Sequence, residues 1–311
     1  MWICKNSLGK KLFRDYNMDT LKNTLRVLLL LFATALAACL LYPVVWSSIN
    51  PFFDFEPDRV FRRVWMIAVI IGLIGWGKDI GLRNPREVGF VLRKDGYFNA
   101  FIGVLVAWFF LGMLTFGYFT AGMWQIRADV DTLYVLKKVV EGPFKGLLIA
   151  GIEEYVFRGL IFFSLARRWG WIPAALFSSA IFSMLHFVQG HGLNNAEGLS
   201  AWYAGFFWCG ILLKSMIARF ELFPAATGLF LIGMIMCYAS IRTGNLWYAA
   251  GLHGGWICYF VICGAIVDYS NADPFLTGGS RLFDGVIPIL GMVVVFPITW
   301  GLIRGKILRK T

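Results

Sequence analysis

The hydrophobic positions of this chain form long apolar runs that short polar segments separate. Crossing the hydrocarbon core of a bilayer takes about 20 apolar residues in a helix, and most of the runs are about that long. The pattern therefore predicts an all-α fold, a polytopic integral membrane helical bundle with eight or nine transmembrane helices. The expected spans are residues 25–48, 64–82, 98–120, 143–166, 171–188, 201–220, 223–241, 245–267 and 283–303.

Polar segments divide the chain into four parts. Residues 1–24 form a basic segment, and residues 25–142 hold the N-terminal membrane helices with a connection. The connection, residues 121–142, carries too many charges to span the bilayer, so we expect an amphipathic helix at the interface. Residues 143–268 form the membrane core that contains the charged cluster described below, and residues 269–311 hold the last membrane helix and a basic tail.

The composition agrees with a membrane protein. Of the 311 residues 59% are hydrophobic and 15% charged, whereas soluble domains have about a quarter charged residues. The net charge of +11 comes from basic residues between the apolar runs, where they act as topology signals and contact anionic lipids. We therefore expect the lipid bilayer as a partner and no nucleic acid. The six cysteines show no CxxC spacing and are expected to be packing residues.

The distribution of lysine and arginine predicts an orientation. These residues are more numerous on the N-terminal side of the alternating spans, which favours a cytoplasmic N-terminus. The tail residues Arg304, Lys306, Arg309 and Lys310 also favour the cytoplasm, which requires an even number of spans. One of the later segments is then re-entrant or interfacial. We expect a multi-pass protein of the cell membrane, in a bacterium the inner membrane.

Two carboxylates and an arginine interrupt the apolar run at residues 143–166. A charged group near the bilayer centre costs at least about 2.5–3.5 kcal/mol, so these groups need pairing or a chemical role. Glu154 and Arg158 are four residues apart on one helix face, which makes them ion-pair partners. Glu153 points about 100° away from that pair. A carboxylate in low dielectric binds a proton more readily, as a general base must.

Two of the three histidines also fall in apolar runs. His186 ends one run and His253 lies in another, and each alone is typical of a hydrogen-bonded core residue. Glu153 lies about 15 Å and His253 about 12 Å into its span. If the spans alternate in direction, all three side chains occupy the same half of the membrane. Beside His253, Gly251 and Gly255 form a GxxxG motif, which favours close helix packing.

Three motifs follow one another in the core region. They are Glu153-Glu154-x-x-x-Arg158, then Phe182-x-x-x-His186, then Thr243-Gly244-x-Leu246-Trp247 leading to His253. In this order and spacing they resemble the motifs of the CPBP family, the type II CAAX prenyl endopeptidases and their bacterial Abi relatives. The resemblance covers about residues 143–268. It implies a glutamic intramembrane endopeptidase that cuts a membrane-associated or lipid-anchored protein or peptide.

The resemblance also implies roles for individual residues. The first glutamate, here Glu153, and the first motif histidine, here His186, would activate a water molecule. The second histidine, here His253, would stabilise the oxyanion, and no cofactor is implied. The supporting residues would be Glu154, Arg158, Phe182 and Trp256.

One position departs from the family pattern. Relatives usually carry Asn four residues after the last histidine, where this chain has Ile257. Either the indole N–H of the preceding Trp256 helps to hold the oxyanion, or the activity is weakened.

The residues leave other functions open. Glu153, His186 and His253 are ligand types that could hold Zn²⁺ with an open position, which gives a zinc-dependent protease, although the sequence contains no HExxH motif. The chain could instead be a non-catalytic membrane partner, such as an immunity or scaffold protein of the same family. A proton- or ion-coupled transporter also uses buried Glu, Arg and His, but the sequence shows no inverted repeat.

Overall fold

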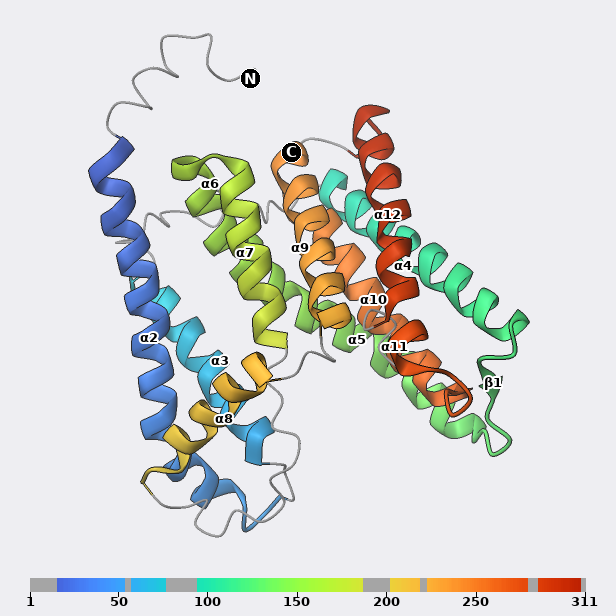
Figure 1. Cartoon of the computed structure of the whole chain (residues 1–311), viewed down its shortest axis with the longest axis horizontal. Coiled ribbons are helices and arrows are strands. Elements are labelled where there is room, and N and C mark those ends of the chain that lie inside the picture. Colours follow the sequence, from blue (N-terminus) through green and yellow to red (C-terminus); the bar gives the residue numbers. More distant parts are fainter. Residues whose placement is uncertain are drawn as a thin grey trace. The chain divides into compact units, whose positions relative to one another are not determined.

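The computed structural model describes residues 16–53, 57–76, 94–186, 202–218, 223–278 and 285–308. These residues are predominantly helical, so the predicted all-α class is confirmed (Figure 1). Two short strands, β1 (Gln125–Ile126) and β2 (Val267–Asp268), pair in the antiparallel direction. Parts of the predicted basic segment 1–24 and of the basic tail lie outside the described residues.

The helices differ widely in length. Eleven of them are α-helices, and η2 is a π-helix that joins α5 to α6 without a break. In the described residues they are α2 (Tyr16–Ile49), α3 (Pro57–Trp76), α4 (Lys94–Thr120), α5 (Thr132–Glu154), η2 (Tyr155–Phe162), α6 (Phe163–Trp169), α7 (Trp171–His186), α8 (Ala204–Ala218), α9 (Phe223–Thr243), α10 (Trp247–Ile266), α11 (Pro274–Thr277) and α12 (Val286–Arg304).

Five helices in the described part of the chain are long and apolar enough to cross a membrane. They are Leu29–Ile49 within α2, and the helices α4, α9, α10 and α12. Helix α7 is apolar but shorter, with 16 residues. A multi-pass membrane protein is therefore supported, whereas the expected number of eight or nine spans is not confirmed.

The connection expected at residues 121–142 is not a separate interfacial helix. Its second half is the beginning of α5, where the Asp131 side chain caps the helix by accepting a hydrogen bond from the Leu133 N–H at 3.0 Å. Helix α5 then continues through Pro143 to Glu154. The helix that carries the glutamates therefore starts earlier than the span expected at residues 143–166.

The chain divides into two compact units. In the smaller unit α2 packs against α3 and α8. Tyr42 of α2 is fully buried there, and its ring meets Phe61 of α3 edge-on, with 5.8 Å between the centroids. The smaller unit comprises residues 1–83, 164–170 and 186–218, and the larger unit residues 84–163, 171–185 and 219–311.

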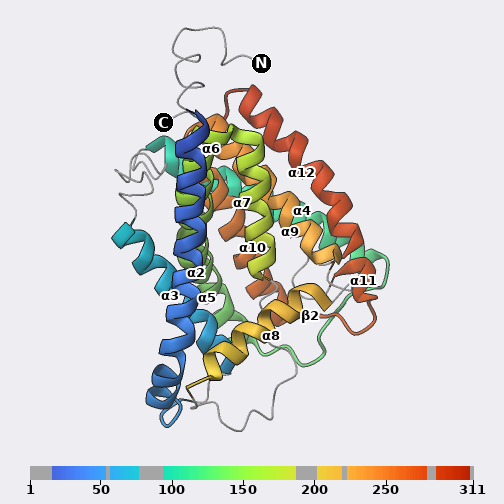
Figure 2. The same ribbon diagram turned by 60° about the vertical axis from the view of Figure 1, so that its left-hand side comes forward.

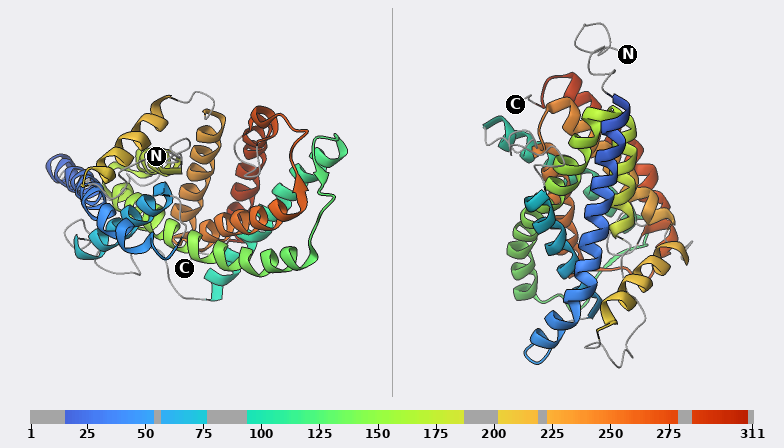
Figure 3. Two further views of the ribbon diagram at one scale, coloured as in Figure 1. Left: turned by 90° about the horizontal axis from the view of Figure 1, so that it is seen from below. Right: turned by 90° about the vertical axis from the view of Figure 1, so that its left-hand side faces the viewer.

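In the larger unit α10 packs against both α4 and α5 (Figures 2 and 3). Glycines permit these contacts. A Cβ atom on Gly251 would overlap the Ala100 carbonyl of α4. A Cβ atom on Gly255 would lie 2.9 Å from another backbone atom of α4. On the other side, a Cβ atom on Gly146 of α5 would overlap the Gly254 carbonyl. The GxxxG pair therefore packs closely against a neighbouring helix, as its motif predicts.

The directions of these helices correct the strict alternation of nine spans. Gly96 near the start of α4 lies against Trp247 at the start of α10. Later in both helices, the Tyr259 hydroxyl donates to Thr115 Oγ1 at 2.8 Å, so α4 and α10 run parallel. Alternation over nine spans would make them antiparallel. The alternation expected for nine spans therefore does not hold for these two helices, and the re-entrant or interfacial segment expected from the basic tail stays a prediction.

The close packing at Gly251 predicts opposite effects for two substitutions in α10. Gly251→Ala places a methyl group against the Ala100 carbonyl, and overpacking of this kind costs about 1–3 kcal/mol. Gly264→Ala is the matched control, because a Cβ atom there meets nothing within 4 Å, and Ala is better than Gly in a helix by about 1 kcal/mol. We expect the purified Gly251→Ala variant to unfold at a lower temperature than the wild type, and the Gly264→Ala variant not to do so. Equal unfolding temperatures for the two variants would contradict the packing.

Candidate active site

Glu153 and Glu154 are the last two residues of α5, and the π-helix η2 begins directly after them. At the end of η2 the Phe163 N–H donates to the Arg158 carbonyl, five residues earlier, so the turn is wider than in an α-helix. Arg158 nevertheless reaches Glu154, because its Nη1 donates to Glu154 Oε1 at 2.9 Å. Both side chains are fully buried. The predicted ion pair is confirmed, whereas the residue types around it do not predict a π-turn.

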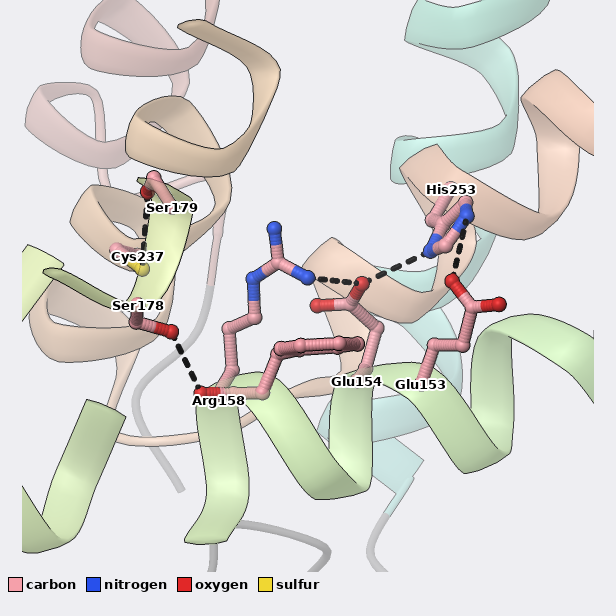
Figure 4. Close-up of polar contacts among 8 residues, drawn as sticks. Glu153, Glu154, Arg158, Ser178, Ser179, Cys237 and His253 are labelled. Atoms are coloured by element: carbon pink, nitrogen blue, oxygen red, sulfur yellow. Dashed lines mark hydrogen bonds and ion pairs between the residues drawn. The ribbon is translucent and has the colours of Figure 1, made fainter. Parts of the chain in front are cut away.

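His253 contacts both glutamates from the second turn of α10 (Figure 4). Its Nδ1 lies 2.9 Å from Glu154 Oε1, and its Nε2 lies 3.7 Å from Glu153 Oε2. One carboxylate oxygen of Glu154 therefore contacts both His253 and Arg158. Sequence reasoning paired Glu154 with Arg158 alone, because helical spacing identifies neighbours on the same helix and not those on another.

Phe182 of α7 packs against this charged group. The Arg158 guanidinium lies over its ring at 4.1 Å from the centroid, and the His253 ring meets it edge-on at 5.7 Å. The Phe182 ring is almost fully buried and also contacts Phe157. A cation over an aromatic face gains about 2 kcal/mol when both are desolvated. Phe182, expected as a supporting residue, therefore holds Arg158 and His253 from one side.

His186 is the last residue of α7, whose position two serine hydroxyls help to set. Ser178 Oγ donates to the Phe157 carbonyl at 2.9 Å (Figure 4). Ser183 Oγ donates to the Ala226 carbonyl at 2.7 Å. Each bond joins α7 to another element, η2 in the first case and α9 in the second. These contacts join residues far apart in the sequence, so the motifs gave no signal for them.

Glu153, His186 and His253 meet as the sequence predicts. One polar atom from each lies within 4.8 Å of those of the other two. All three side chains are half-buried, with 22% of the Glu153 side chain and 11% of the His253 side chain exposed. Glu154 and Arg158 are wholly buried. The arrangement therefore divides into a part that water can reach and a sealed ion pair behind it.

The turn between α9 and α10, which Asn245 completes, orients His253. Gly244 has a φ of +74°, which few residues other than glycine adopt, and it ends α9. Thr243 Oγ1 donates to the Ala239 carbonyl at 2.9 Å, and the Trp247 N–H donates to the Asn245 side chain at 3.1 Å. The Thr-Gly-x-Leu-Trp motif therefore forms the turn at which α9 ends and α10 begins. The sequence pointed to the motif but not to the hydrogen bond that the Asn245 side chain accepts from the Trp247 N–H.

Trp256 packs against α4. Its ring is almost fully buried, with 5.6 Å between its centroid and that of Phe110. The indole N–H has no hydrogen-bond partner in the part of the chain that the structure describes. Ile257 follows it and is half-buried. The role of Trp256 as a second oxyanion donor stays a prediction.

The three half-buried residues match zinc ligands in kind. Two histidine nitrogens and one carboxylate oxygen occur in catalytic zinc sites, which hold each ligand atom at about 2.0–2.2 Å from the metal. Atoms that all lie within 4.8 Å of one another can approach that geometry after small side-chain rotations. The residues therefore fit a zinc ion as well as a water molecule.

Comparison with known families agrees with the motifs. Residues 136–258 match the family model described as type II CAAX prenyl endopeptidase Rce1-like. The match covers less than half of the chain but includes every residue of the site. No curated protein and no solved structure matches the chain. Residues 136–258 are therefore similar to the Rce1-like type II CAAX prenyl endopeptidases, and the resemblance expected from the motifs is confirmed for this part of the chain.

Proposed function

We propose that the chain is an intramembrane endopeptidase that uses Glu153 and His186 to activate water. The family match supports a membrane protease of the type II CAAX prenyl endopeptidase kind. The observation that carries the mechanism is the meeting of the polar atoms of Glu153, His186 and His253 within 4.8 Å. That spacing leaves each group about one bridging water from the others.

The proposed reaction begins with a water molecule held between Glu153 and His186. Glu153 takes a proton from this water, and the water oxygen attacks the carbonyl carbon of the scissile peptide bond. The negative charge that develops on the carbonyl oxygen is stabilised by the His253 Nε2–H. Glu153 then passes its proton to the leaving amine, so that the peptide bond breaks and the carboxylate is restored.

The contacts of His253 support its proposed role. A carboxylate faces each of its ring nitrogens, Glu154 at Nδ1 and Glu153 at Nε2. The contact of Nδ1 with the buried Glu154 holds the ring, so that Nε2 is turned toward Glu153, where the proposed oxyanion would form.

The substrate class follows from the setting of the site. The catalytic groups lie between helices of a multi-pass membrane protein, and helices α9 and α10 that flank the site are apolar enough to cross a bilayer. A peptide that reaches them must therefore be held at or in the membrane. We propose a membrane-associated or lipid-anchored protein as the substrate, in a cell membrane with the N-terminus of the protease in the cytoplasm.

Zinc-dependent hydrolysis is a second candidate, because Glu153, His186 and His253 fit a metal ion. Zinc would supply a Lewis acid for the bound water. The three residues would then be its ligands. This candidate changes the role of Glu153 from base to ligand and leaves the substrate class unchanged.

Glu153→Gln should abolish cleavage without unfolding the protein. The amide cannot take a proton, and loss of a general base lowers the rate by about 10²–10⁴-fold. Membranes that contain the wild type or the variant are compared by proteomics for one precursor that accumulates only with the variant. Glu141→Gln is the control, since Glu141 is on the same helix but pairs with Lys138 and Lys145. Processing by Glu153→Gln at the wild-type rate would refute the proposed mechanism.

Glu154 and Arg158 should instead support stability. Removing one member of a buried ion pair leaves an uncompensated charge and costs about 3–5 kcal/mol, whereas replacing both is much less harmful. We expect Arg158→Met to lower the unfolding temperature strongly and Glu154→Gln with Arg158→Met to recover part of the loss. The measurement is thermal unfolding of the purified protein. A double variant no more stable than Arg158→Met would contradict the pairing.

Metal removal distinguishes the two proposed mechanisms. The glutamate mechanism predicts that a protein stripped with 1,10-phenanthroline and dialysed keeps its activity and holds no stoichiometric zinc by elemental analysis. The zinc mechanism predicts one zinc per chain, loss of activity on stripping and recovery with added Zn²⁺. Zinc bound to wild type but not to His186→Ala would place the metal at this site.

A further inference from the structure

Four helices of the larger unit have an end in the same region of that unit. The start of α4 lies against the start of α10, because a Cβ atom on Gly96 would overlap the Trp247 ring. Helix α9 ends in the turn that leads into α10. The last turns of α12 reach the same region, since the Tyr248 hydroxyl lies 2.8 Å from Thr299 Oγ1.

Positive charge gathers where these four ends meet. The described charged residues there are four cations and one carboxylate, namely Lys94, Arg242, Arg304 and Lys306 with Asp95. The described residues of the opposite half, apart from the site, are five carboxylates and four cations, namely Asp129, Asp131, Glu141, Asp268 and Asp273 with Arg127, Lys137, Lys138 and Lys145. We call Lys94, Arg242, Arg304 and Lys306 the basic cluster. Its members come from three regions far apart in the sequence, so the fold brings them together.

Aromatic rings accompany the basic cluster, as they do where a membrane meets water. Tyr97 of α4 and Trp247 of α10 lie with their ring centroids 5.1 Å apart. Trp300, one turn before the end of α12, is 42% exposed. Earlier in α12, Val293 and Phe296 are also exposed, as side chains that contact acyl chains are. The basic cluster is therefore at the level of the lipid headgroups.

Two arginines of the cluster lie over aromatic rings of their own helices. The Arg242 guanidinium is 5.4 Å from the Tyr238 centroid, and the Arg304 guanidinium is 4.7 Å from that of Trp300. The Tyr238 ring also contacts Phe296, with 5.5 Å between the centroids, so the two helices that carry the arginines pack together. Among the described residues no carboxylate forms an ion pair with either arginine. Both side chains are exposed, so an anion from outside can reach them.

We propose that the ends of α9 and α12 form a binding site for the headgroup of an anionic phospholipid, whose phosphate Arg242 and Arg304 hold. A guanidinium donates two parallel N–H bonds to a phosphate, and basic pockets between membrane helices bind anionic headgroups. The acyl chains lie along the exposed apolar residues of α12. The inference does not depend on the proposed protease function, so it can be tested without a substrate.

The test measures lipid binding to the full chain, purified in detergent, by native mass spectrometry. We expect dioleoylphosphatidylglycerol, which is anionic, to bind more tightly than dioleoylphosphatidylcholine, which has no net charge. Arg242→Gln and Arg304→Gln should each lower the affinity for phosphatidylglycerol about fivefold, the factor that one basic residue near an anionic surface contributes. The double arginine variant is compared with Lys137→Gln, Lys138→Gln. This control removes two charges from the opposite half and should leave the affinity unchanged.

Variants are compared only if their size-exclusion profiles and unfolding temperatures without lipid resemble those of the wild type. Arg304→Gln alone, in the last turn of α12, tests the site if the double variant misfolds. Wild-type affinity in the arginine variants would overturn the proposal. An equal loss in the lysine control would also overturn it, because attraction would then depend on net charge alone. So would inorganic phosphate that raises the unfolding temperature as much as phosphatidylglycerol does, since the site would then take free phosphate.

Discussion

The arrangement of the site depends on the cost of placing charge in an apolar surrounding. Glu154 and Arg158 are wholly buried, and an isolated ion there would be far too costly. Each therefore needs the other, and Glu154 takes His253 as a further partner at 2.9 Å. The carboxylate oxygen that both partners contact joins α10 to the end of α5. Because the partners come from two helices, this one oxygen determines how those helices meet.

Helix packing has to bring these partners within a hydrogen bond of one another. The imidazole of His253 is short, so it reaches the glutamates only if α10 and α5 approach closely. Gly146 and Gly254 allow such an approach, since a side chain at Gly146 would overlap the facing backbone. Gly251 and Gly255 do the same towards α4 on another side of α10. Without a hydrophobic force between helices in lipid, contacts of this kind supply much of the association.

Much of this could be predicted from the sequence, because the relevant signals are local or costly. Apolar runs predict helices, and a spacing of four residues pairs Glu154 with Arg158. Three ordered motifs identified Glu153, His186 and His253 as residues that meet. The motifs identify these residues without knowledge of helix directions, so the identification does not depend on the number of spans, which is not confirmed.

Other features could not be predicted, for physical reasons that differ. An apolar run has the same sequence pattern whichever way the helix points. The parallel course of α4 and α10 therefore could not be predicted from the sequence. The π-helix after Glu154 changes the hydrogen-bond spacing of Tyr155–Phe162, and the residue types of that segment do not reveal such a change. The bond from Glu154 to His253 joins residues 99 positions apart, and no periodicity connects them.

The division between a sealed pair and an accessible group has a further consequence for the chemistry. A base that must exchange protons with water cannot be buried as deeply as Glu154. A carboxylate whose ion pair holds two helices together is weakened if water competes for it. Two adjacent glutamates at the end of one helix meet both needs, because their side chains point about 100° apart. Glu154 is fully buried in its pair with Arg158, whose guanidinium lies over the Phe182 ring, and Glu153 keeps 22% of its side chain exposed. The wider π-turn then begins at the first residue beyond them, so Arg158 is placed by η2 while Glu153 is placed by α5. Arg158 and the proposed base are thus held by different backbone geometries, and Glu154 links the two because it shares α5 with Glu153 and pairs with Arg158.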